Sequence, residues 1–123
     1  MTHDACPQIT FQVQDATGQA KQVLLCVDEH TAQGSLHMTA VEGGAAQQRE
    51  FSALQKNRDG TVLTCKVSIA TVTFTIDTAP SPPTLHMVAR AFMPLLETTY
   101  TMSRDDQQRL VAWIKALAIP ECA

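Results

Sequence analysis

The chain has 123 residues, a net charge of −3 and no segment in which lysine and arginine concentrate. This length suits one domain with a buried core and is too short for two ordinary domains, so we expect residues 1–123 to form a single domain. Hydrophobic residues at 45% with charged residues at 17% exclude a disordered chain, and the acidic charge argues against nucleic acid as a partner.

Alternation of apolar and polar residues between about residues 9 and 92 predicts an antiparallel meander of six or seven β-strands. Turn residues such as Asp15 and Gly18 separate the apolar runs, as in a small barrel or sandwich. The fold class is therefore mainly β. The expected strands lie at residues 9–14, 23–27, 36–40, 49–55, 61–68, 71–77 and 84–92, where Pro94 ends the last one. Whether residues 98–101 add a further short edge strand is left open.

Residues 45–56 fit either a helix or a strand. Their composition favours a helix, yet Phe51 and Leu54 would make only a thin apolar stripe on it. As a strand, the segment would pair with the next one through a hairpin at Asp59 and Gly60. We favour a strand at about residues 49–55 and leave the helix open.

A single amphipathic helix is expected at residues 104–118. Ser103 is a good N-cap, and Asp106 completes a capping-box pattern with it. Pro120 prevents the helix from continuing. The apolar stripe should lie on the sheet, which predicts that the helix closes one end of the barrel. That stripe is made by Leu110, Val111, Ile114, Leu117 and Ala118, with Trp113 beside it.

The polar first eight residues lack the basic and apolar regions of a signal peptide, and no apolar run reaches the ~20 residues of a membrane span. We therefore expect a cytoplasmic protein that does not enter a membrane and whose cysteines are reduced. Cys26 and Cys65 fall within apolar strand patterns, so both are expected to be buried core residues. The four cysteines, which are Cys6, Cys26, Cys65 and Cys122, have no zinc-binding spacing, and no metal or cofactor is expected.

Two histidines, His37 and His86, occupy strand positions that alternate with core residues. If their strands were neighbours, both imidazoles would share the outer face with Arg90 and form a candidate ligand-binding or acid–base site. Separate solvated surface residues are the alternative. The sequence has no nucleophile motif and no phosphate-binding glycine loop, which favours a non-enzymatic protein.

The layout of antiparallel strands followed by one helix resembles pleckstrin-homology-like domains, whose closing helix carries a tryptophan, as Trp113 does here. It also resembles the PilZ family of bacterial regulatory domains. Glu29, Thr31 and Gly34 have the spacing of the Asp/Asn-x-Ser-x-x-Gly element of PilZ domains, with Glu and Thr substituted. The Arg-x-x-x-Arg motif that binds cyclic di-GMP is absent, since the first arginine of the chain is Arg49. The resemblance thus implies a PilZ-like domain that has lost nucleotide binding.

Three functions follow from these observations. The first is a regulatory or adaptor domain that acts through protein–protein contacts, a homodimer among them. The second is a cyclic-dinucleotide sensor in which Glu29, Thr31 and Gly34 line the pocket. The third is a small barrel that holds an apolar ligand, suggested by the low aromatic content of 5% and by five methionines, whose flexible side chains adapt to irregular ligands.

Overall fold

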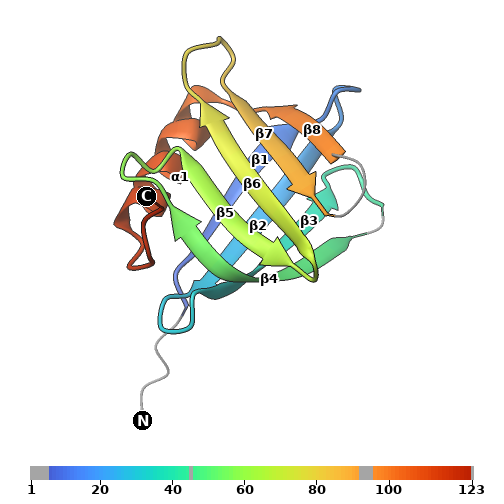
Figure 1. Ribbon diagram of the computed structural model, residues 1–123. Coiled ribbons are helices and arrows are strands. Elements are labelled where there is room, and N and C mark those ends of the chain that lie inside the picture. The colour runs from blue at the N-terminus through green and yellow to red at the C-terminus, as the bar shows by residue number, and fades with distance from the viewer. Residues whose placement is uncertain (1–5, 45, 92–95, 123) are drawn as a thin grey trace.

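Eight antiparallel strands, hydrogen-bonded in chain order, form a closed barrel that is followed by one helix (Figure 1). The computed structural model describes residues 6–44, 46–91 and 96–122. The fold class predicted from the sequence is therefore confirmed. The elements are β1 (Gln8–Gln14), β2 (Ala20–Asp28), β3 (Gln33–Ala40), β4 (Gln47–Lys56), β5 (Val62–Val67), β6 (Ala70–Asp77), β7 (Thr84–Arg90), β8 (Leu96–Thr101) and α1 (Arg104–Ala116).

The strand count is eight, which corrects the expected six or seven. The extra strand arises because β8 is longer than the predicted short edge strand and pairs with β7 along its whole length, from Leu96 to Thr101. It also meets β1 through the pair Gln14 and Thr101, which closes the barrel. The expected end of the preceding strand at Phe92 and Pro94 lies outside the described residues.

A β-bulge in β4 explains why residues 45–56 were ambiguous in sequence. The register with β5 shifts between Ser52 and Gln55, and Ala53 has a positive φ of 54°. One extra residue changes which alternate positions face inward, so Phe51 and Leu54 are both buried although they are three residues apart. The helix-like spacing of these apolar residues is thus produced by a bulged strand.

The same bulge turns Lys56 inward beneath the end of α1. Its side chain is buried, and Nζ donates hydrogen bonds to the carbonyl oxygens of Lys115, at 2.7 Å, and of Leu117. Carbonyl groups in the last turn of a helix lack partners within the helix and carry partial negative charge. Lys56 therefore fastens the C-terminal end of α1 to the barrel.

The N-terminal end of α1 is fastened by Asp106 and Arg109, which cover the part of β1 that β8 does not reach. The Asp106 Oδ2 atom accepts from the backbone N–H of Gln12 at 3.0 Å, and Arg109 Nη2 donates to the Thr10 carbonyl at 3.1 Å. Ser103 is the N-cap, as predicted, because its Oγ accepts from the N–H of Asp106. These side chains therefore take the place of a neighbouring strand.

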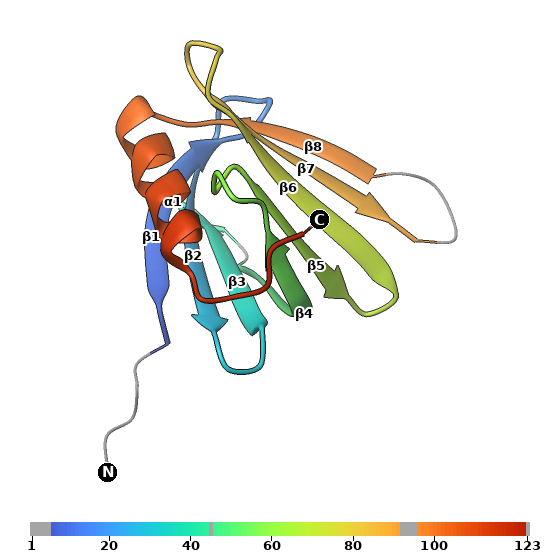
Figure 2. The same cartoon turned by 60° about the vertical axis from the view of Figure 1, so that its left-hand side comes forward.

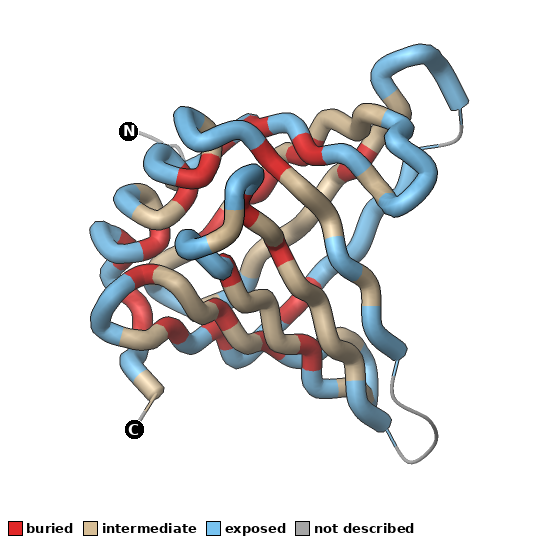
Figure 3. The backbone as a smooth tube through the Cα atoms, turned by 90° about the horizontal axis from the view of Figure 1, so that it is seen from above, coloured by how far each residue is buried: buried red, intermediate tan, exposed pale blue. Residues whose placement is uncertain are grey.

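Between these two attachments α1 lies across one end of the barrel, from β1 to the β4–β5 turn (Figure 2). Leu110 and Ile114 are 1% and 2% exposed and face the barrel interior, which confirms the predicted packing of the helix. The helix ends at Ala116 and not at residue 118, because Leu117 is already extended, with ψ of 136°. Figure 3 shows buried residues in red on the strands and on the helix that packs against them.

The two cysteines expected in the core differ in position. Cys65 faces inward and is buried, and this burial raises the pKa of its thiol to about 12. Cys26 is not a core residue, which corrects the expectation from the sequence. Val23, Leu25 and Val27 occupy the inward positions of β2, so Cys26 faces outward, is half-buried, and its Sγ lies 3.5 Å from Gln8 Oε1.

Replacing Leu110 by alanine should reduce the free energy of unfolding by about 2–5 kcal/mol, because it removes a buried side chain from the closed end of the barrel. Urea unfolding monitored by circular dichroism would measure the loss. The matched control is Gln108→Ala on the exposed face of α1, which should change the free energy by less than about 0.5 kcal/mol. An equal, small effect of both substitutions would contradict the packing described for α1.

Iodoacetamide at pH 8 should modify Cys6 in the folded protein and leave Cys65 unmodified. The thiolate is the reactive form, and below its pKa of about 12 the buried Cys65 thiol remains protonated, whereas Cys6 is exposed. Peptide mass spectrometry would measure both sites, and urea-unfolded protein serves as the control in which both react. Rapid modification of Cys65 in the folded protein would contradict its burial.

Candidate ligand-binding cavity

The histidines and arginine singled out in the sequence do not meet in the structure. His37 lies on β3, whereas His86 and Arg90 lie on β7, and three strands separate β3 from β7 in either direction around the barrel. All three side chains face outward, because the inward positions of these strands belong to residues such as Met38 and Met87. The His86 ring nitrogen Nδ1 lies 2.7 Å from Thr99 Oγ1.

The residues that resemble the PilZ element lie in and beside the β2–β3 turn, where Glu29 and Gly34 have structural roles. Glu29 Oε2 accepts a hydrogen bond from the backbone N–H of Ala118 at 2.6 Å, which holds the segment after α1. Thr31 is exposed. Gly34 lies where a Cβ atom would overlap the carbonyl oxygen of Cys26 and approach Phe51 Cε2 to 2.9 Å, so the strands pack closely at this point.

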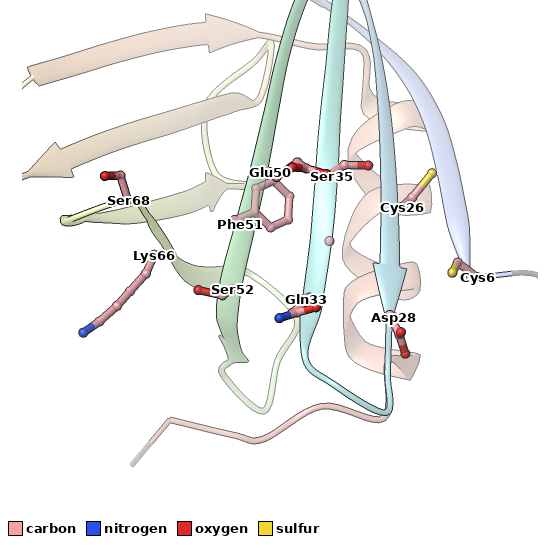
Figure 4. Close-up of a pocket in the computed structure, with 11 residues that line it drawn as sticks. Cys6, Cys26, Asp28, Gln33, Ser35, Glu50, Phe51, Ser52, Lys66 and Ser68 are labelled. Carbon is pink, nitrogen blue, oxygen red and sulfur yellow. The ribbon is translucent and has the colours of Figure 1, made fainter.

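A depression of about 430 Å³ lies on the outer surface beside Gly34 (Figure 4). Its charged residues are Asp28, Glu50 and Lys66, and Figure 4 shows the Lys66 ammonium directed away from the other labelled side chains. Glu29 and Thr31 are not among the residues that line it. The depression therefore offers little positive charge to a phosphate group.

A second, mainly apolar site lies inside the barrel. Its volume is about 420 Å³, within the range of roughly 300–1,000 Å³ that is usual for small-molecule sites. Leu110 and Ile114 of α1 form its floor, and inward-facing residues of all eight strands form its walls. Phe11, Val23 and Leu85 are representative of these walls. The cavity is thus closed at the helix end.

The opposite end of the barrel is the mouth of this cavity. There β3 ends, β4 begins and the β5–β6 turn lies, away from α1 (Figures 1 and 2). Phe11 and Leu63 are buried, whereas Val67, Met87 and Ala89 face inward but are only half-buried. Protein interiors are normally close-packed, so inward-facing apolar side chains with residual exposure indicate that the barrel interior opens toward this end.

Four polar residues line the cavity: Gln47, Arg49, Thr98 and Tyr100. Arg49 is exposed, and its Nη1 donates to the carbonyl of Gln48 at 3.0 Å. Within residues 6–44, 46–91 and 96–122, no carboxylate lies within 4.0 Å of Arg49. Partial burial raises the pKa of Tyr100, and the nearby negative charge of Asp15 raises it further, so its hydroxyl is neutral at pH 7.

The described residues that line the cavity are mainly apolar. Among the described residues that line it there is no carboxylate, histidine or cysteine, the groups that usually act as acids, bases or nucleophiles. In the same part of the chain, no cluster of three or more His, Cys, Asp or Glu has the geometry of a metal site. Nor does any described helix have the length and apolarity needed to cross a membrane.

Sequence reasoning missed Gln47 and Arg49 as site residues. Both precede the bulge in the segment that fitted either a helix or a strand, so their direction was undetermined. Counting back from the buried Phe51 in steps of two places Arg49 and Gln47 on the inward face. That signal becomes readable only once the segment is known to be a strand.

The chain matches no protein-family model, no curated protein and no solved structure. Its function is therefore inferred from its own residues and their geometry.

Proposed function

We propose that this protein binds a small, mainly apolar molecule in the interior of its barrel. The observation that carries the proposal is the apolar cavity of about 420 Å³, closed by Leu110 and Ile114 and open at the other end. An apolar molecule that enters such a cavity leaves water and contacts apolar walls, and this transfer is worth about 25 cal/mol per Å² of buried apolar area. Of the functions expected from the sequence, the geometry thus favours the small barrel that holds an apolar ligand.

The side chains around the mouth support this proposal. Val67, Ala70 and Ala89 are small, and they leave space where larger residues would fill the barrel. Met38 and Met87 also line the cavity, and methionine side chains adapt their shape to irregular apolar ligands. A wall that combines small and flexible residues accommodates a chain-like or compact apolar molecule.

Protein–protein contact is the second candidate function. The exposed large hydrophobic residues of the described chain are Val41, Ile69 and Leu96, which are 53%, 70% and 61% exposed. Val41 and Ile69 lie in turns at the mouth, and Leu96 begins β8 at the same end. Apolar residues gathered on one face are typical of interaction sites, and a regulatory partner or a second copy of the chain would bind there.

A cyclic-dinucleotide sensor has less support, because the depression beside Gly34 contains Asp28 and Glu50. Negative charge at that position repels the phosphates of such a ligand. The cytoplasmic location expected from the sequence stays a prediction.

Isothermal titration calorimetry with decan-1-ol tests the proposed cavity. The wild-type protein should bind this neutral chain, and Ala89→Phe should weaken binding about tenfold or more, because a phenyl ring would occupy the space at the mouth. The matched control is Val88→Phe, since Val88 directly precedes Ala89 in β7 and faces outward. It should leave decan-1-ol binding unchanged.

Thermal unfolding of both variants separates a filled cavity from a misfolded barrel. Equal weakening by both substitutions, with both variants folded, would place the ligand outside the cavity. The absence of decan-1-ol binding by the wild-type protein would overturn the proposed function.

A further inference from the structure

Among the described residues that line the cavity, Arg49 is the one with a charged side chain. We propose that the ligand is an amphiphile whose anionic oxygen-bearing head group binds Arg49 at the mouth while its apolar chain extends toward Leu110 and Ile114. The chemistry shared by such head groups is a carboxylate or phosphate with at least two oxygens. This inference rests on the proposed function and specifies which apolar molecules the cavity selects.

The backbone of β4 places Arg49 on the inner face. Arg49 pairs with Leu36 of β3, and both side chains line the cavity. Two residues further toward the mouth, Gln47 pairs with Met38, and these two side chains also line it. The guanidinium group is therefore attached to a paired part of the sheet, ahead of the bulge at Ser52 to Gln55, and not to a loop.

The hydrogen-bonding capacity of Arg49 is mostly unused by the described residues. A guanidinium group carries five N–H donors, and the one bond found for Arg49 goes to the Gln48 carbonyl at 3.0 Å. Lys21 provides a contrast, because its Nζ lies 3.9 Å from the carboxylate of Asp15. Arg49 thus retains donors in the planar arrangement that binds a carboxylate or phosphate through two parallel hydrogen bonds.

The position of Arg49 at the exposed mouth also fits the energetics of an amphiphile. Burying an ionised head group in the apolar interior would be costly, whereas a head group at the mouth remains partly hydrated. The chain then occupies the apolar inner part of the cavity, where Leu110 and Ile114 are almost completely buried. The amide of Gln47, on the same face as Arg49, provides a neutral donor beside the guanidinium group.

Calorimetry with ligands that share one ten-carbon chain tests this inference. Decanoate and decyl phosphate carry oxyanion head groups, decan-1-ol is neutral, and decyltrimethylammonium is positively charged. The wild-type protein should bind at least one oxyanion about tenfold or more tightly than decan-1-ol, and the cation most weakly. The tighter of the two oxyanions identifies the head group as a carboxylate or a phosphate.

The variant Arg49→Gln should lower oxyanion affinity to within about twofold of that for decan-1-ol, while decan-1-ol binding stays the same. The matched control is Arg90→Gln, which removes the same charge from an exposed residue on the outer face of β7 and should change neither affinity. Unchanged decan-1-ol binding by both variants also shows that their cavities remain folded.

The failures are distinguishable. If wild-type protein binds all four ligands equally, or if Arg49→Gln and Arg90→Gln lower oxyanion affinity to the same extent, the role of Arg49 is overturned and the proposed apolar cavity stands. If the wild-type protein does not bind decan-1-ol, the proposed function is overturned together with this inference.

Discussion

The packing of α1 across one end of the barrel is the interaction on which the rest of the structure depends. An eight-stranded barrel has two ends, and here Leu110 and Ile114 close one of them. Because that end is closed by apolar side chains, the interior becomes an apolar cavity with a mouth and a floor. Lys56 holds one end of the helix and Asp106 holds the other, so the position of the floor is determined by polar contacts at both ends.

The bulge in β4 gives this barrel its asymmetry. Before the bulge, the inward face of β4 carries Gln47 and Arg49 near the mouth. Beyond the bulge, β4 turns Lys56 inward, and its Nζ donates to carbonyl groups at the C-terminal end of α1. A single extra residue therefore lets one strand present one cation to the cavity mouth and another to the helix. Arg49 is exposed and retains N–H donors for a ligand, whereas Lys56 is buried and its ammonium group is hydrogen-bonded to the end of α1.

Much of the fold could be predicted from the sequence because its signals are local. Period-two alternation indicated the strands, and Ser103 with Pro120 delimited the region of the helix. The bulge at Ala53 was not predictable, since a positive φ at alanine leaves no mark in the residue pattern. Without the bulge, the inward positions of β4 could not be assigned, and a half-exposed cavity wall looks in sequence like an ordinary core.

The candidate site was harder to predict because it depends on which strands are neighbours. His37 and His86 occupy similar positions within their strands, yet the barrel order places three other strands between them. Cys26 shows the same limitation within one strand, because an apolar run does not reveal which side of the sheet each residue faces. Only the closed barrel determines that Arg49 and Leu110 face the same interior.

A crystal structure of the protein with 10-bromodecanoate tests the central claim most directly, because anomalous scattering locates the bromine at the far end of the chain. The account predicts a bromine inside the barrel beside Leu110 and Ile114, with the carboxylate next to Arg49. A bromine bound only on the outer surface of the barrel would contradict it.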